Sequence, residues 1–170
     1  TSIGLYDVFI SKLDANGNFV WARNIGSSSF DYGITINVDN FGDIIITGEV
    51  RGTVDLDPGP SVATFTTLGN GDIFALKLSA AGNYIWGKLT GGTDYDSPIN
   101  STLDNLGNLI LVGQYGTSCD FDPGPSAVTY TSLGWWDAFI TKWDINGNFI
   151  WAKSLGGIGF DQAFSVATDN

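Results

Sequence analysis

The sequence predicts an all-β fold built from tandem copies of one antiparallel unit. Related segments recur every 65 residues, at 7–13, 72–78 and 137–143, with no slippage in register. Short runs rich in Val, Ile, Phe and Thr alternate with Gly, Asn and Asp, which is the pattern of strands and turns. No helical periodicity extends beyond two turns. A fixed repeat of this length indicates one supersecondary unit that buries its core by stacking on its neighbours.

One complete unit shows the expected order of strands and turns. Asn40-Phe41-Gly42 supplies the turn between the first two strands, with the glycine suited to a positive φ. Residues 51–70 form an insertion that carries an Asp-Pro-Gly-Pro segment and a hairpin of its own. A second turn at residues 80–82 precedes the last strand. The four expected strands cover residues 33–39, 43–50, 72–79 and 83–89.

Such a four-stranded meander has two open edges and two apolar faces, so it is not expected to be stable alone. Radial repetition gives every sheet a neighbour and produces a β-propeller of four-stranded blades. Common blade repeats are about 40–50 residues long. The inserted hairpin between strands two and three accounts for the longer repeat of this chain.

The predicted repeat array covers residues 1–170. The second half of a blade occupies residues 1–30, and complete blades occupy 31–95 and 96–160. Residues 161–170 are expected to form the first strand of a further blade. The array therefore reads as part of a larger propeller or assembly, with other copies or the remaining blades of a longer chain as partners.

Two segments carry a resemblance to a known repeat. Residues 137–153 read DAFITKWDINGNFIWAK, and residues 53–59 read TVDLDPG. Together they resemble SBBP, the seven-bladed β-propeller repeat of large secreted and surface-exposed bacterial proteins. The resemblance implies a propeller fold and an extracellular setting, and it implies no particular reaction.

The expected function is a non-catalytic structural or interaction module: a scaffold, an adhesin segment or a self-assembling subunit. The alternative is a propeller module that binds glycans, with or without calcium. A net charge of −11 argues against nucleic acid and against anionic membranes, which favour basic proteins. No apolar run is long enough for a transmembrane helix, and residues 1–7 lack the basic start of a signal peptide.

Catalysis is not expected. The chain has no histidine, which is the commonest general base, and zinc coordination is disfavoured for the same reason. Cys119 is the only cysteine, and Val54 stands at the equivalent position one repeat earlier. This exchange predicts a small buried apolar side chain rather than a reactive thiol.

The repeated Asp-x-Asp-Pro-Gly-Pro segment has two interpretations. Its paired carboxylates would lie on one side of an extended strand, where a calcium ion could balance their repulsion if further oxygens completed the shell. A turn with Pro and Gly at its centre explains the same residues without a metal. Both interpretations remain open for the candidate calcium ligands Asp55, Asp57, Asp120 and Asp122.

Residues that break the repeat are candidates for specific contacts. Trp135 and Trp136 replace Asn70 and Gly71 beside an insertion. Together with Tyr115, these tryptophans could form an aromatic platform for a sugar ring or a partner chain. The alternative is that at least one tryptophan covers the inserted hairpin.

The repeated aromatic and basic side chains are expected to serve the unit itself. Packing between blades is expected for the residues Trp21, Trp86, Trp151, Phe9, Phe74 and Phe139. Pairing with repeated aspartates is expected for the residues Lys12, Lys77, Lys142, Arg23, Lys88 and Lys153.

Overall fold

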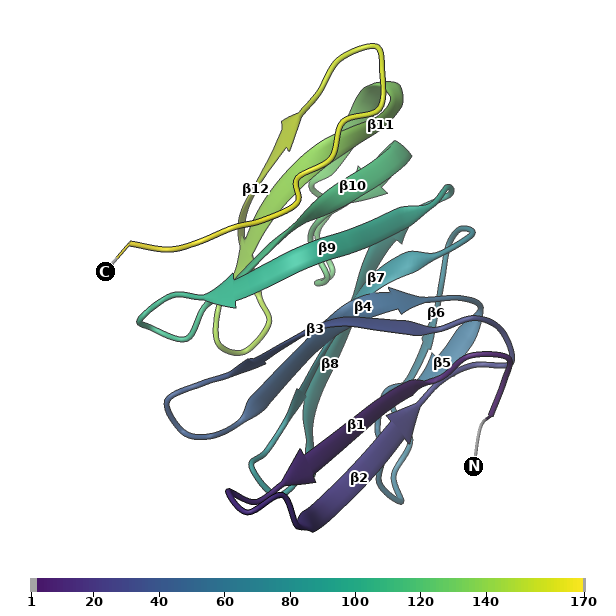
Figure 1. The fold of residues 1–170 in the computed structure, drawn as a ribbon. Helices are drawn as coiled ribbons and strands as arrows, with labels where there is room; N and C mark the ends of the chain where they lie inside the picture. The colour runs from purple at the N-terminus through teal and green to yellow at the C-terminus, as the bar shows by residue number, and fades with distance from the viewer. Residues whose placement is uncertain (1–2, 170) are drawn as a thin grey trace.

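The structure, a computed structural model, describes residues 3–169 and is all-β in that range (Figure 1). Thr1, Ser2 and Asn170 belong to the predicted array but lie outside the described residues. The strands are β1 (Val8–Leu13), β2 (Phe19–Ile25), β3 (Tyr32–Val38), β4 (Ile44–Val50), β5 (Thr53–Asp55), β6 (Thr64–Thr66), β7 (Asp72–Leu78), β8 (Tyr84–Gly92), β9 (Asp96–Leu103), β10 (Leu109–Asp120), β11 (Thr129–Trp143) and β12 (Phe149–Leu155).

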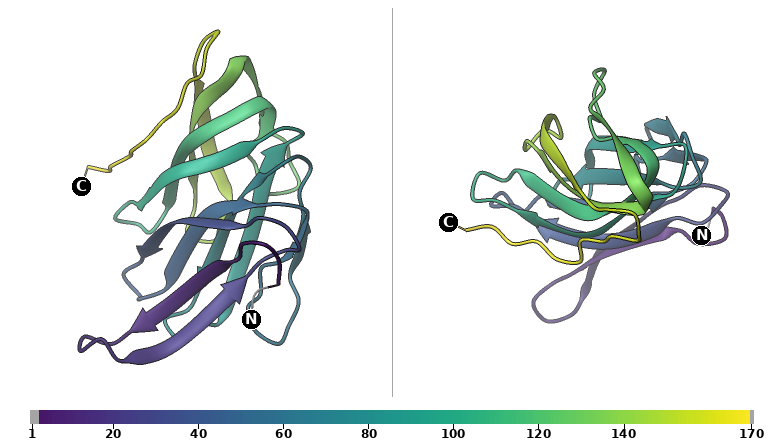
Figure 2. Two further views of the ribbon diagram at one scale, coloured as in Figure 1. Left: turned by 45° about the vertical axis from the view of Figure 1, so that its right-hand side comes forward. Right: turned by 90° about the horizontal axis from the view of Figure 1, so that it is seen from above.

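The strands form antiparallel meanders in chain order. Strands β3, β4, β7 and β8 pair successively, and β9, β10, β11 and β12 do the same. A short pairing of Cys119 with Gly92 and of Asp120 with Gly91 joins β10 to β8. Strands β1 and β2 form a separate two-stranded sheet at the other end of the molecule (Figure 1). The described sheets form an open stack and not a closed barrel (Figure 2).

Tight turns join the strands where the sequence predicted them. The turn glycines Gly42 and Gly107 adopt φ values of 79° and 80°, in the left-handed region that a glycine enters without steric cost. Asp39 accepts the backbone N–H groups of Phe41 and Asp43 at one carboxylate oxygen. The aspartate and the glycine together fix the turn and therefore the register of the strands on either side.

The inserted hairpin differs between the two complete units. In the first it is the separate pair β5–β6, whereas in the second its arms continue from β10 and β11 after a register shift between Gly116 and Ser118. Thr117 has a positive φ of 42° at this shift, and Gly52 with φ 73° occupies the equivalent position. The hydroxyl of Thr117 donates to a carboxylate oxygen of Asp94 at 2.8 Å, which helps to hold this uncommon conformation.

The structure differs from the prediction at residues 161–170, where the sequence predicted a strand. The described part of this segment, up to Asp169, is extended but belongs to no ladder (Figure 1). Ala163 donates its N–H to the carbonyl of Gly113 at 3.3 Å, and the Thr168 hydroxyl donates to the carbonyl of Leu103 at 3.4 Å. A strand requires a neighbour of matching register, and no described strand stands beside this segment in the way that β4 stands beside β3.

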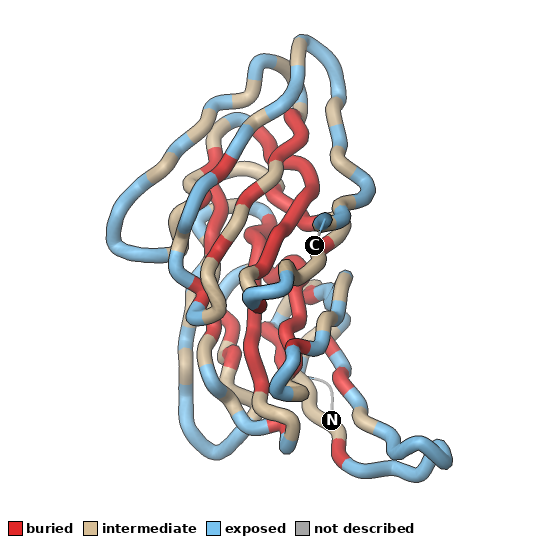
Figure 3. Tube along the Cα trace, turned by 90° about the vertical axis from the view of Figure 1, so that its left-hand side faces the viewer, coloured by how far each residue is buried: buried red, intermediate tan, exposed pale blue. Residues whose placement is uncertain are grey.

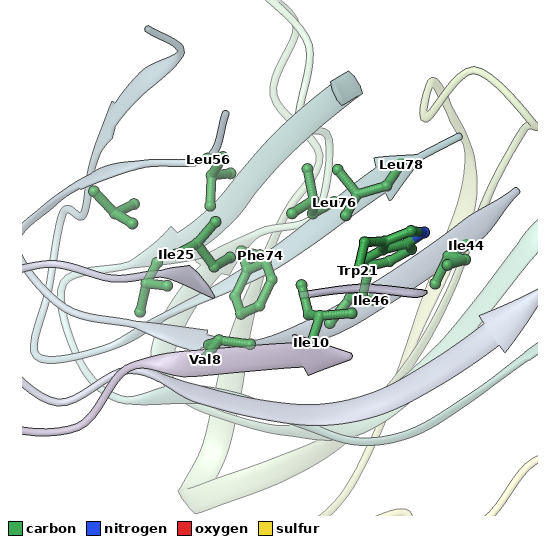
Figure 4. Close-up of a cluster of buried hydrophobic side chains, with 12 residues drawn as sticks. Val8, Ile10, Trp21, Ile25, Ile44, Ile46, Leu56, Phe74, Leu76 and Leu78 are labelled. Atoms are coloured by element: carbon green, nitrogen blue, oxygen red, sulfur yellow. The ribbon is translucent and has the colours of Figure 1, made fainter. Parts of the chain in front are cut away.

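Buried residues gather along the central strands, and exposed residues along the turns and the C-terminal segment (Figure 3). All seven residues of β4 and all seven of β7 are buried, so both faces of this part of the sheet are covered. Figure 4 shows the cluster in which side chains of β1 and β2 meet those of the next meander. Its members include Val8, Ile10, Trp21, Ile25, Ile44, Ile46, Leu56, Phe74, Leu76 and Leu78.

Candidate functional site

The joints between successive units are built from the same contacts 65 residues apart. The indole Nε1 of Trp21 donates to the carbonyl of Ala80 at 3.3 Å, and that of Trp86 donates to the carbonyl of Ile145 at 3.2 Å. A β-carbon at Gly82 would lie 3.0 Å from Cδ2 of Trp21, so the indole packs directly on the turn. Each tryptophan therefore docks one unit onto the turn that follows strand three of the next.

Ion pairs between lysine and aspartate repeat with the same spacing. Lys77 Nζ lies 2.8 Å from Asp39 Oδ2, and Lys142 Nζ lies 2.7 Å from Asp104 Oδ2. This confirms the expected pairing of repeated lysines and aspartates at these two positions. Burial would raise the pKa of Asp104, but the Lys142 ammonium and the amides of Asn108 and Leu106 lower it to about 2. The pairs hold strand three to the turn between strands one and two.

A second group of repeated aspartates begins strand three of each unit. Asp72 Oδ2 accepts the N–H of Leu68 at 2.8 Å, whereas its buried Oδ1 has no hydrogen-bond partner among the described residues. A β-carbon on Gly91 would lie 2.6 Å from the Asp72 carboxyl carbon, so only glycine fits there. Burial, with a smaller contribution from the charge of Glu49, raises the pKa of Asp72 to about 6.

The pKa of Asp96 is raised further than that of Asp72. Its Oδ2 accepts the N–H of Gly92 at 2.6 Å, and its Oδ1 accepts the N–H of Gly116 at 3.2 Å. Burial outweighs these hydrogen bonds, and the charges of Asp72 and Asp94 add to it, so that the pKa rises to about 7. The carboxylate joins three chain segments at the boundary between the two complete units.

The unrepeated residues Glu49 and Arg51 meet at the same boundary, which the sequence did not predict. Arg51 Nη2 lies 2.9 Å from Glu49 Oε1, and Glu49 is 1% exposed. The Arg51 guanidinium lies 5.8 Å from the ring centroid of Phe30 and 5.7 Å from that of Tyr95. Arg51 therefore bridges aromatic rings that stand 65 residues apart. The only sequence signal that marked Glu49 and Arg51 was that neither residue is repeated at the equivalent position of the next unit.

The Asp-Pro-Gly-Pro segments are turns whose carboxylates cap the backbone. Asp55 Oδ1 accepts the N–H groups of Asp57 and Ala63 at 3.0 and 2.8 Å, and Asp57 Oδ1 accepts the N–H of Gly59 at 2.7 Å. Asp120 and Asp122 repeat these bonds. Within residues 3–169, no three acidic, cysteine or histidine side chains stand close enough to hold a metal ion. A hollow of about 480 Å³ lies beside the first turn, lined by Asp57, residues 59–63, Asn83 and Tyr84.

The three residues proposed as an aromatic platform do not stand together. Trp135 is 71% exposed and stacks on Phe160, with ring centroids 5.8 Å apart and an interplanar angle of 18°. Trp136 is half-buried and contacts Phe160 edge-on at 5.3 Å. Tyr115 is fully buried, and its hydroxyl hydrogen bonds to that of Ser154 at 2.6 Å. Tyr115 therefore belongs to the core, and Phe160 takes the place beside Trp135.

Cys119 is fully buried, as its exchange with Val54 predicted. Burial raises the pKa of its thiol well above the ordinary value, and the nearby aspartates add to the shift. The sulfur is therefore a packing group between the two complete units and not a nucleophile. No helix in the described part of the chain is long and apolar enough to cross a membrane.

No family model matches the chain. An uncharacterized WD repeat-containing protein of Acanthamoeba polyphaga mimivirus is 24% identical over 180 residues, which cover 92% of this chain and 13% of the relative. The regulatory protein FlaEY of Caulobacter vibrioides is 23% identical over 145 residues, covering 85% of this chain and 15% of the relative. The likeness thus extends along most of the chain but reaches only a small part of each longer protein.

Proposed function

We propose that the chain is a run of propeller-type blades of the SBBP kind and acts as a non-catalytic interaction module. The repeated docking of Trp21 and Trp86 on the following unit carries this proposal. Because successive units dock through equivalent contacts, further units can be added without a new kind of interface. The rigid stacked sheets then present the variable insertions at residues 51–70 and 116–136. The proposed mechanism is shape, and the lack of histidine, the commonest general base, supports a non-catalytic role.

The relatives support a repeat module in general terms. One of them is described as containing WD repeats and the other as a regulatory protein, and neither description names an enzymatic reaction. We further propose a secreted or cell-surface bacterial parent, in which the module serves as scaffold, adhesin segment or self-assembling subunit. The support is the SBBP resemblance together with an acidic, lysine-poor composition.

Light scattering on the 170-residue chain tests the proposal, first with calcium and then with a chelator. A discrete multimer or a filament is the expected result, because exposed apolar side chains such as Phe9, Ile36 and Val38 lie on strands that other repeats would cover. A folded monomer throughout a wide concentration range would contradict an assembly role. Loss of the multimer in chelator would support calcium as a cofactor.

A glycan-binding module remains the second candidate because of one observation. The exposed ring of Trp135 lies nearly parallel to that of Phe160, and such a flat aromatic surface suits the apolar face of a sugar. A glycan array should then give a signal that Trp135→Ala removes and Leu133→Ala keeps, since Leu133 is equally exposed on the same strand. An array with no signal for the unaltered chain would exclude this function.

A further inference from the structure

Strand β1 differs from its two counterparts in having one open edge. Strand β7 pairs with β4 on one side and β8 on the other, and β11 likewise lies between β10 and β12. Strand β1 pairs with β2, and no other strand in residues 3–169 pairs with it. An exposed strand edge is a template for a further strand.

Two side chains of β1 are also more exposed than those at the same positions of β7 and β11. Phe9 is 71% exposed, whereas its counterparts Phe74 and Phe139 are fully buried. Leu13 is 55% exposed, and its counterparts Leu78 and Trp143 are fully buried too. The sequence thus places core side chains on β1 although the described residues leave them in solvent.

The two buried phenylalanines show what covers this position. Phe74 stands opposite Gly48 of β4, and Phe139 opposite Gly113 of β10. A β-carbon on Gly48 would lie 2.6 Å from Phe74 Cε1, and one on Gly113 would lie 2.9 Å from Phe139 Cε1. In both units the ring therefore packs against a glycine of the strand that covers this edge.

A hollow of about 290 Å³ lies beside the open edge, between β1 and β3. Its lining includes the apolar residues Val8, Phe9, Ile10, Ile34 and Ile36. One repeat later, β7 and β9 are the counterparts of β1 and β3, and there β4 pairs with β7 and also contacts β9. The internal repeat therefore identifies both the empty position and the kind of strand that fills it.

We propose that the open edge of β1 is an acceptor site for one antiparallel strand of the β4 and β10 type. The ligand has a run of leucine and β-branched residues followed by a glycine, as in Ile44–Gly48 and Leu109–Gly113. Its glycine is placed opposite Phe9, the register of Gly48 with Phe74. The inference rests on the proposed function, because it states how a repeat module accepts its next repeat.

A synthetic peptide with the sequence of residues 109–116, flanked by lysines for solubility, tests the site. The matched control peptide carries Gly113→Val, whose side chain would collide with the Phe9 ring. Binding to the full chain is followed by titration calorimetry and by hydrogen exchange of the β1 amides. We expect saturable binding that slows exchange in β1, and binding weakened about tenfold or more for the valine peptide.

Variants of the chain separate edge pairing from general stickiness. Phe9→Lys should abolish binding without unfolding the chain, because the ring is exposed. Phe41→Lys should keep it, because Phe41 is equally exposed and does not line the hollow. Equal binding of both peptides, or no binding, overturns the site. Slow exchange in β1 without peptide, at concentrations where light scattering shows a monomer, also overturns the site, since no second copy is then present to cover the edge. Light scattering without peptide tests the proposed function independently.

Discussion

The ammonium group of Lys77 lies 2.8 Å from the carboxylate of Asp39, and the two side chains are only 6% and 1% exposed. Breaking a buried pair leaves one unpartnered charge, so Lys77→Met should lower the free energy of unfolding by about 3–5 kcal/mol. Denaturant unfolding measures this loss. Lys142→Met is the matched control, because its pair with Asp104 is more exposed and should contribute less. Equal losses of unfolding free energy in the two variants would contradict the claim that burial strengthens the Lys77–Asp39 pair.

Gly48 should tolerate no side chain. A β-carbon there would lie 2.6 Å from Phe74 Cε1 and would also collide with the carbonyl of Tyr32. Gly48→Ala should therefore lower the unfolding free energy by about 2 kcal/mol or more. Gly157→Ala offers the control, since a β-carbon at Gly157 has no neighbour within 4 Å. A thermal melt of Gly48→Ala that matches the unaltered chain would show that Phe74 does not pack on this glycine.

Two carboxyl groups should titrate far apart. The pKa of Asp96 is raised to about 7 from 3.8, whereas that of Asp104 is lowered to about 2. Carbon-13 NMR of the side-chain carboxyl groups measures both midpoints directly. Midpoints that both lie near 3.8 would contradict the burial of Asp96 and the ion pair of Asp104.

These pKa shifts predict the direction in which the stability of the chain changes with pH. Between pH 3.8 and about 7 the folded chain keeps the proton of Asp96 that the unfolded chain has released, so this contribution to stability falls as the pH rises. Asp104 contributes stability above pH 3.8 that is lost as the pH falls toward 2. The contribution of these two groups to the denaturation midpoint should therefore decline on both sides of an optimum near pH 3.8.

The Asp-Pro-Gly-Pro turns should be stable without calcium. Asp55 already bonds two backbone N–H groups through one oxygen, so a chelator should leave the melting temperature unchanged. Asp55→Ala should lower the unfolding free energy by about 1–3 kcal/mol, because those two donors lose their partner. Asp57→Ala should cost less, since Asp57 caps one N–H group, that of Gly59. A chelator that lowers the melting temperature would contradict a metal-free turn.

Much of the fold could be predicted from the sequence. The expected strands at residues 33–39 and 43–50 correspond to β3 and β4, because alternating β-branched residues and the glycine at position 42 fix the strands and the turn. Asp55 and Asp57 could not be assigned from spacing alone, since turns and metal loops use the same residue types. The backbone N–H groups that they cap decide the geometry.

Other features could not be predicted from the sequence, because they depend on contacts between residues that lie far apart in the chain. The sequence hypothesis placed Tyr115 with Trp135 in one platform, yet the Tyr115 ring packs edge-on against Phe121 inside a buried cluster. Strand alternation gives no warning when both faces of a strand are buried. The bridge of Arg51 to Phe30 and Tyr95 joins residues from separate units, and no local pattern encodes such a contact.

Hydrogen exchange of the tryptophan indole N–H groups tests the repeated joint most directly. Trp21 and Trp86 donate to the next unit, whereas Trp151, at the same position of the repeat, has no indole acceptor within residues 3–169 and is 36% exposed. The account predicts slow and similar exchange for Trp21 and Trp86 and fast exchange for Trp151. Fast exchange at Trp21 or Trp86, as at the exposed Trp135, would contradict the docking of units through these indoles.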